Sequence, residues 1–257
     1  MQPEIGLVAP AKKNAATARG RRQEAAMRTI PGVALILVLT SWASAKGEVA
    51  ANPYPTMAPV AEYLMARDAE TKMARSAAPA SISANAEVLL MTKTGYVVAA
   101  TGTNGWVCLV GRMWSAGLDD PEFWNPKGHG PACLNPAAVQ SVLPFYIART
   151  KLALAGDSRE EMAKKEAAAY ASHEFSEPRG FALMLSKQGY LNDGVAGPWR
   201  PHVMPFVAKD KLETWGAGFK GSPILSPATD TFRAYEPVTL VILAPRWSDG
   251  TLAPKLR

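Results

Sequence analysis

The strongest constraint on how this chain can fold is its only pair of cysteines, Cys108 and Cys133. A bond between them would close a loop of about 25 residues and stabilise the fold by about 3 kcal/mol in the chain-entropy treatment. Such a bond requires an oxidising compartment, whereas in the cytoplasm the same residues would be two separate buried thiols. The destination of the chain therefore decides how the cysteines are interpreted.

The N-terminal region predicts export. Met27 and Arg28 precede the stretch TIPGVALILVLTSWASAKG, in which the apolar run 33–39 is followed by small residues. Ala43-Ser44-Ala45 fits the A-x-A pattern of signal-peptide cleavage, with the cut before Lys46. The uncharged stretch is at the short limit for a bilayer span, so a cleaved signal is favoured over an uncleaved anchor. We predict a signal peptide over residues 27–45 and a Cys108–Cys133 disulfide.

The same analysis divides the chain into segments. A leader that starts at Met1 would be unusually long, whereas one that starts at Met27 has the usual length, so residues 1–26 are interpreted as an upstream extension from an over-extended start. Residues 46–56 form a linker with two prolines, and residues 57–257 are long enough for one domain with a real core. We expect a periplasmic or extracellular protein without a stable membrane span after cleavage.

Net charge gives no indication of a nucleic-acid partner. The chain has 28 Lys and Arg against 22 Asp and Glu. Residues 1–45 hold six of the basic residues and two of the acidic ones, so 22 and 20 remain after cleavage. The basic character thus comes mainly from the leader, and no run of Lys and Arg interleaved with aromatics follows residue 46.

Hydrophobic spacing predicts an α+β fold. A helix over residues 57–78 precedes three strands that turn signals would join into an antiparallel meander, followed by two central helices and further strands. Because strands and helices cluster instead of alternating, we expect an N-terminal helix, an antiparallel sheet of about six to seven strands, and two central helices. The expected strands are 87–92, 96–100, 106–110, 180–185, 202–208, 223–225 and 238–244, and the central helices are 134–154, capped by Asn135, and 159–171, capped by Asp157 or Ser158.

The stretch LSKQGYLNDGVAGPWRPHVMPF, residues 185–206, is the first candidate site. His202 with Asp193 could form an acid–base or metal-ligand pair, Trp199 a stacking wall and Arg200 an anion clamp. The alternative is a structural hairpin in which Asn192 and Asp193 make the turn, Trp199 covers the core and His202 is a satisfied sheet residue. The candidate binding residues are Lys187, Tyr190, Asn192, Trp199, Arg200 and His202.

The stretch DDPEFWNPKGHG is the second candidate site. Asp119, Asp120 and Glu122 offer carboxylates of the kind that hard cations prefer, and His129 follows them. The spacing differs from that of an EF-hand loop, and the alternative is a solvated acidic turn anchored by aromatic neighbours. The common nucleotide-binding, hydrolase and zinc-protease motifs are absent from the sequence, so no cofactor is assigned.

Three stretches carry a resemblance to a known group of proteins. DDPEFWNP, SKQGYLND and WRPHVMPF resemble uncharacterised exported bacterial proteins, in which the last stretch reads W-x-P-H-x-M. The resemblance covers most of residues 60–250 and implies export without implying an activity. Those proteins often carry a further histidine at the position of Arg200, so the departure here weakens a metal-site interpretation.

These observations lead to one main functional prediction and two alternatives. We expect an exported protein that binds a small molecule or a partner in a cleft between the loops 112–131 and 186–206. The first alternative is a hydrolase-type enzyme that uses His202 with Asp193 or with the carboxylates of the second site, with or without a metal. The second alternative is a structural envelope protein whose tryptophan-rich surface meets a partner.

Overall fold

The computed structural model describes residues 52–190 and 200–254 of the chain. These residues all belong to one compact unit. The predicted upstream extension, the signal peptide and residues 46–51 of the linker lie outside the described residues, as do Asn192, Asp193 and Trp199. Within the described part, no helix is long and apolar enough to span a bilayer.

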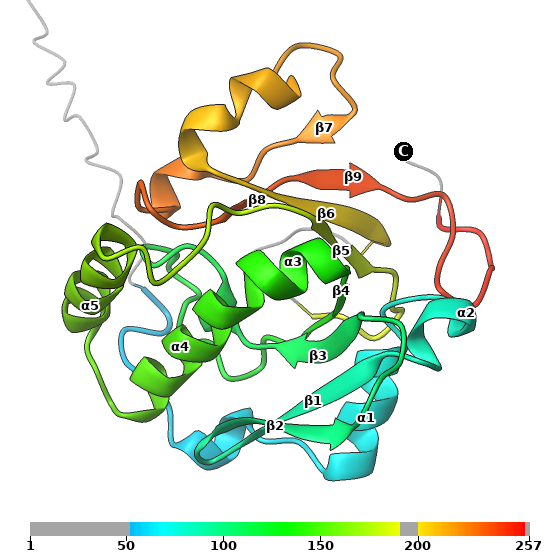
Figure 1. The fold of residues 1–257 in the computed structure, drawn as a ribbon, viewed down its shortest axis with the longest axis horizontal. Helices are drawn as coiled ribbons and strands as arrows, with labels where there is room; N and C mark the ends of the chain where they lie inside the picture. The colour runs from blue at the N-terminus through cyan, green and yellow to red at the C-terminus, as the bar shows by residue number, and fades with distance from the viewer. Residues whose placement is uncertain (1–51, 191–199, 255–257) are drawn as a thin grey trace, which may run out of the picture. The chain divides into compact units, whose positions relative to one another are not determined.

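A single sheet of nine strands forms the centre of the described unit (Figure 1). The strands follow the order β2-β1-β3-β4-β5-β6-β9-β7, and β8 pairs separately with β6. The α+β class is confirmed, although the sheet has more strands than the predicted six to seven. The strands are β1 Glu87–Thr92, β2 Gly95–Ala100, β3 Val107–Gly111, β4 Gly130–Leu134, β5 Phe181–Met184, β6 His202–Val207, β7 Ile224–Leu225, β8 Val238–Thr239 and β9 Val241–Leu243.

The predicted three-stranded meander is wrong. β3 lies beside β1 and runs parallel to it, so β2 becomes an edge strand. The connection after β2 is therefore a crossover, which passes so close to β1 that a Cβ added at Gly102 would lie 2.2 Å from the Glu87 backbone nitrogen. The Asn104 side chain holds this crossover by accepting from Trp106 N and donating to the Ile82 carbonyl.

Strand β4 was not predicted, although it is central to the sheet. It pairs with both β3 and β5 and places Cys133 directly opposite Cys108. The predicted disulfide between these residues is present. The strand begins with Gly130 and Pro131, which normally indicate a loop, and it has only five residues.

The helices lie where they were predicted, but two of the predicted helices are interrupted. The expected helix over 57–78 is a short 3-10 turn, Val60–Tyr63, followed by α1, Arg67–Arg75. The first central helix divides into α3, Pro136–Ser141, and α4, Leu143–Leu154, where Pro144 interrupts the hydrogen bonding. Helix α5, Arg159–Ala171, has its predicted bounds and begins with a capping box between Ser158 and Glu161. A short helix α2, Ala80–Ser83, follows Pro79.

Helices cover the two faces of the sheet, and each face has its own core. On one face, which we call the α1 face, alternate residues of β1, β3 and β4 pack with α1 and the turn that follows it. On the other, the α4 face, the intervening residues pack with α3 and α4, which lie across the sheet in Figure 1. This alternation follows from the two-residue period of a strand.

Candidate functional site

The middle of the α4 face is hollow because three of its residues are small. Gly111 of β3 lies opposite Gly130 of β4, and Ala132 is the next residue of β4 on the same face. These positions present no more than one methyl group each, whereas the flanking positions Leu109 and Leu134 are large. The result is a cavity of about 260 Å³, which we call the sheet cavity.

The walls of the sheet cavity come from segments far apart in the sequence. β6 contributes the alternate residues His202, Met204 and Phe206, and α4 contributes Tyr146. Met184 of β5, Thr239 of β8 and Val241 of β9 also line it, together with two connecting segments, residues 112–120 after β3 and residues 227–232 before β8. The other lining residues on these segments are Arg112, Met113, Ser115, Ala116, Asp120, Pro227, Ala228, Thr231 and Phe232.

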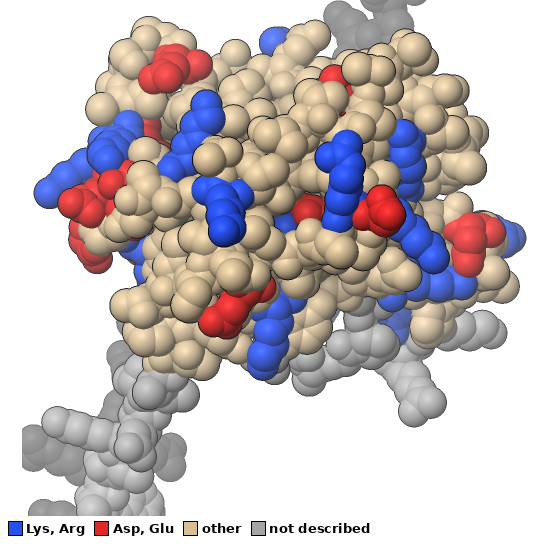
Figure 2. Space-filling view, turned by 90° about the horizontal axis from the view of Figure 1, so that it is seen from below, with Lys and Arg blue, Asp and Glu red and all other residues tan. Residues whose placement is uncertain are grey.

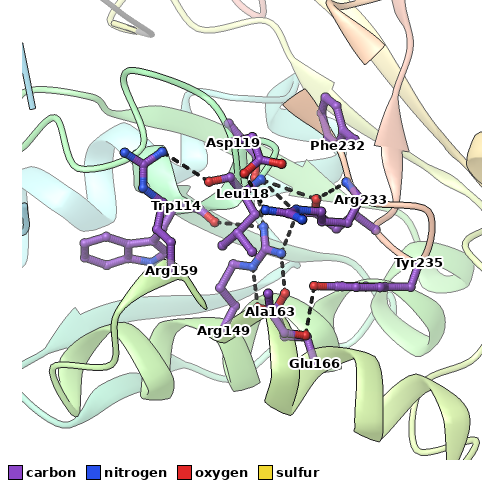
Figure 3. Close-up of polar contacts among 12 residues, drawn as sticks. Trp114, Leu118, Asp119, Arg149, Arg159, Ala163, Glu166, Phe232, Arg233 and Tyr235 are labelled. Atoms are coloured by element: carbon purple, nitrogen blue, oxygen red, sulfur yellow. Dashed lines mark hydrogen bonds and ion pairs between the residues drawn. The ribbon is translucent and has the colours of Figure 1, made fainter. Parts of the chain in front are cut away.

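A buried arginine holds the first wall segment in place (Figure 3). Arg149 of α4 donates from Nε and Nη2 to the two carboxylate oxygens of Glu166 at 2.7 and 2.6 Å. Its Nη1 donates to the Ala116 carbonyl at 2.9 Å, and its guanidinium lies 4.4 Å from the centroid of the Phe145 ring. Arg149 therefore joins α4 and α5 to the wall segment 112–120.

Glu236 joins the second wall segment to the same network. Its carboxylate accepts from Arg149 Nη2, from Leu118 N at 3.0 Å and from Arg233 N. Burial raises the pKa of Glu236, and the adjacent Arg149 opposes that rise. The network thus connects both wall segments through one buried carboxylate.

The two wall segments also touch each other directly. Asp119 N donates to the Thr231 carbonyl at 3.0 Å, and the Asp119 carboxylate pairs with Arg233 at 2.7 Å. Gly117 packs so closely that an added Cβ would lie 2.3 Å from the Thr231 carbonyl oxygen. These contacts fix the distance between the walls.

Two polar side chains of the lining have unused hydrogen-bonding capacity among the described residues. Tyr146 is 7% exposed, and its hydroxyl makes no hydrogen bond to any residue that the structure describes. Asp120 accepts from Glu122 N at 2.8 Å through one oxygen and forms no ion pair within the described residues. Burial raises the pKa of both groups, so the Tyr146 hydroxyl is protonated at neutral pH.

His202 is a neutral imidazole at the end of β6. It is 6% exposed, and its Nδ1 lies 2.8 Å from the Arg200 carbonyl. A carbonyl can only accept, so Nδ1 carries the proton and Nε2 carries a lone pair. Burial lowers the pKa of His202, which keeps the ring uncharged at neutral pH.

The structure brings together the two loops that the sequence indicated. His129 and Tyr190 exchange backbone hydrogen bonds of 2.7 and 2.9 Å. Of the candidate residues in the later loop, His202 lines the cavity, Lys187 pairs with Asp249 at 2.6 Å, and Arg200 donates to the Pro254 carbonyl at 2.8 Å. Asn192, Asp193 and Trp199 lie outside the described residues.

The candidate metal ligands are dispersed among other contacts. Asp119 pairs with Arg233, Glu122 accepts from Asn125 at 2.7 Å, and only Asp120 lines the sheet cavity. His129 has a buried Nε2 without a hydrogen-bond partner among the described residues, and burial lowers its pKa. Among residues 52–190 and 200–254, no group of three or more His, Cys, Asp or Glu is arranged to hold a metal ion.

Basic and acidic side chains are mixed on the face of the molecule in Figure 2. On the face in Figure 2, Lys and Arg lie among Asp and Glu, and uncharged residues cover most of the area between them. Of the tryptophans that the structure describes, only Trp215 is exposed, at 43%.

Several residues of the cavity were not predicted. Tyr146 looks like an ordinary core position in a helical pattern, and the wall 227–232 has no distinguishing motif. The sequence shows that Gly111, Gly130 and Ala132 are small, but only the strand pairing shows that they are neighbours. No protein-family model, curated protein or solved structure matches this chain.

Proposed function

We propose that this chain binds a small, largely apolar molecule in the sheet cavity. The observation that carries the proposal is the hollow over Gly111, Gly130 and Ala132 in a face that is otherwise filled. Elsewhere an apolar cavity of about 150 Å³ accommodates benzene, and ligand pockets usually begin near 300 Å³. A volume of about 260 Å³ therefore suits one ring with a few substituents or a short branched chain.

The lining favours an apolar body. Leu109, Met184, Met204 and Phe206 contribute from the sheet, and Phe232 contributes from the wall. Burial of apolar surface yields about 25 cal/mol per Å², so a ligand of this size gains most of its affinity from contact area. The flexible thioethers of the two methionines can adapt to its outline.

Binding of small aromatic alcohols by calorimetry tests this proposal. We expect saturable binding of benzyl alcohol to the wild-type protein, with a rise in Tm. Ala132→Leu fills the floor of the cavity and should abolish both effects, whereas Ala99→Leu, on the α1 face, should preserve them. Equal binding by both variants would place the ligand elsewhere and overturn the proposal.

One observation favours a second function, a hydrolase-type enzyme. Asp120 and His202 line the same cavity, so a carboxyl and a neutral imidazole face a common space. In this proposal the His202 imidazole would accept a proton from a water molecule as its oxygen attacks the carbonyl of a small ester, and would return that proton to the alcohol that leaves. Turnover of short p-nitrophenyl esters that is lost in His202→Gln and in Ala132→Leu would support it, whereas turnover unchanged in both would exclude this site.

We also propose that the protein acts in the periplasm or outside the cell. The buried disulfide between Cys108 and Cys133 is compatible with an oxidising compartment and supports this location. The leader-like sequence and the resemblance to exported bacterial proteins support it independently. Fractionation of the producing cell, with mass determination of the mature N-terminus, tests the proposal. A mature chain that starts at Lys46 is expected, and a chain retained in the cytoplasm with reduced cysteines would contradict it.

A further inference from the structure

We propose that the ligand of the sheet cavity is an organic cation, an amine on a small apolar body. This inference rests on the proposed function and specifies its ligand class. It follows from the charges that line the cavity, from the unused hydrogen-bonding groups there and from the aromatic rings beside them.

The one arginine among the described lining residues already has a charged partner. Arg112 Nη2 pairs with Glu70 at 2.9 Å, and the two side chains are 0% and 1% exposed. Arg112 Nε donates to the Tyr63 carbonyl at 2.8 Å, and Nη1 donates to the Val110 carbonyl at 2.5 Å. The guanidinium is therefore neutralised and directed to other partners, so it cannot serve as a clamp for an anionic ligand.

Asp120 is the acidic residue of the described lining, and its carboxylate forms no ion pair with any described residue. Arg159 lowers the pKa of Asp120 against the larger rise that burial causes, and its Nη1 donates to the backbone carbonyls of Leu118 and Asp120 at 3.4 and 3.1 Å. Those contacts direct the Arg159 guanidinium toward the backbone, as Figure 3 shows for Leu118. A ligand ammonium group would provide the Asp120 carboxylate with the ion pair that it lacks.

Charge behind the wall has the same sign. The network at Arg149 contains two carboxylates, Glu166 and Glu236, against one guanidinium. His202 is neutral, so it adds no positive charge on the opposite side of the cavity. Among the described lining residues, an anionic ligand would meet no cation other than Arg112, which Glu70 already neutralises, and this is costly because desolvated charge requires a partner.

The remaining groups suit an amine on an aromatic or aliphatic body. The buried Tyr146 hydroxyl can accept a hydrogen bond from an ammonium N–H, because its oxygen has no partner among the described residues. The rings of Tyr146, Phe206 and Phe232 line the same space, and an ammonium group is attracted to aromatic faces. Carboxylate, hydroxyl and rings together define a site for a small amine.

Three probes of nearly equal shape test the ligand class: benzylamine, benzyl alcohol and benzoate, titrated calorimetrically at pH 7.5. We expect benzylamine to bind the wild-type protein at least tenfold more tightly than benzoate. Asp120→Asn keeps an oxygen for Glu122 N and removes the charge, so it should weaken benzylamine about tenfold and change benzyl alcohol less than threefold. Asp210→Asn is the charge control, since Asp210 is exposed, pairs with Lys211 and does not line the cavity.

The outcomes separate this inference from the function on which it rests. If benzyl alcohol binds in an Ala132→Leu-sensitive way but benzylamine is no tighter than benzoate, the cation proposal is wrong and the cavity remains a binding site. The same conclusion follows if Asp210→Asn and Asp120→Asn weaken benzylamine equally. If none of the three probes binds the wild-type protein, the proposed function fails along with the cation proposal.

Discussion

The two faces of strands β3 and β4 differ in how completely they are filled. On the α1 face, Cys108, Val110 and Cys133 are fully buried against Ala74 and Ala77, and the disulfide joins the two strands. On the α4 face, the residues between them are small and leave the sheet cavity. Neighbouring residues of the same short strands thus serve stability on one side and leave room for a ligand on the other.

The buried arginines repeat this contrast. Arg112 borders the sheet cavity, but its guanidinium pairs with one carboxylate on the α1 side, Glu70, and the charges balance. On the α4 side Arg149 pairs with two, and the extra carboxylate, Glu236, holds backbone N–H groups of both wall segments. The filled face therefore has a closed ion pair, whereas the hollow face has a network that positions its walls.

The largest effect is expected from removal of the shared cation. Arg149→Met would leave two buried carboxylates without their partner and should lower the free energy of unfolding by about 3–5 kcal/mol, the usual cost of breaking a buried pair. Urea unfolding at pH 7 measures this. Arg112→Met is the matched variant and should cost less, because it leaves one carboxylate unpaired. A greater loss in Arg112→Met would contradict the contrast between the two faces.

The disulfide should stabilise the fold without changing ligand affinity in the sheet cavity. The double variant Cys108→Ala/Cys133→Ala opens a loop with a sequence separation of 25 residues, and we expect a loss of about 3 kcal/mol in unfolding free energy. Ligand affinity, measured on the folded variant, should remain within twofold of wild type because the bridge faces α1. A parallel loss of affinity would show that the two faces are coupled.

Local signals explain which parts of the fold could be predicted from the sequence. Helix α5 was predicted with its bounds because its start signal is local: Ser158 was one of two expected N-cap residues, and in the structure it forms a capping box with Glu161. Strand β4 was missed because Gly130 and Pro131 resemble a loop, and their place in the sheet depends on pairing with β3 and β5. The position of β3 beside β1 was missed for the same reason, since a crossover and a hairpin begin with similar turn residues.

The candidate site was predicted in part. The sequence indicated the loops that contain Asp120 and His202, because polar residues concentrate there, and both residues line the sheet cavity. It could not indicate Tyr146, because the pattern of α4 describes a core helix, nor that Gly111 and Gly130 face each other. The cavity forms where small residues of neighbouring strands face the same space. Which residues are neighbours is decided only when the strands pair.

A smaller effect is expected from separation of the cavity walls. A methyl group at position 117 would clash with the Thr231 carbonyl, so Gly117→Ala should cost about 1–3 kcal/mol and reduce ligand affinity. Gly111→Ala is the control for stability only, because its Cβ would make ordinary contacts of 3.4 Å or more with Gly130 and Ser115, whereas its place on the cavity floor means that it should also reduce affinity. Thermal unfolding and benzyl alcohol titration measure both properties. Equal losses of stability in the two variants would argue against a wall contact at Gly117.

The smallest predicted effect is the pH dependence contributed by His202. Its pKa in the folded state is lowered by burial from the usual value near 6.5, so its favourable contribution is fully present above about pH 6.5 and is lost as the pH falls toward the folded-state value. One such group changes the unfolding free energy by at most about 1.4 kcal/mol per pH unit. His202→Gln should therefore flatten the fall in stability between pH 7.5 and 5.5 without removing it, because burial also lowers the pKa of His129. Urea unfolding of wild type, His202→Gln and His129→Gln at these two pH values measures how much each histidine contributes to the fall in unfolding free energy. Bound benzyl alcohol desolvates His202 further and should lower its pKa further, so it should increase the His202 contribution to the fall in stability, because His202 lines the cavity. The His129 contribution should not change, since His129 does not line the cavity. A ligand effect confined to His129 would move the binding site away from the α4 face.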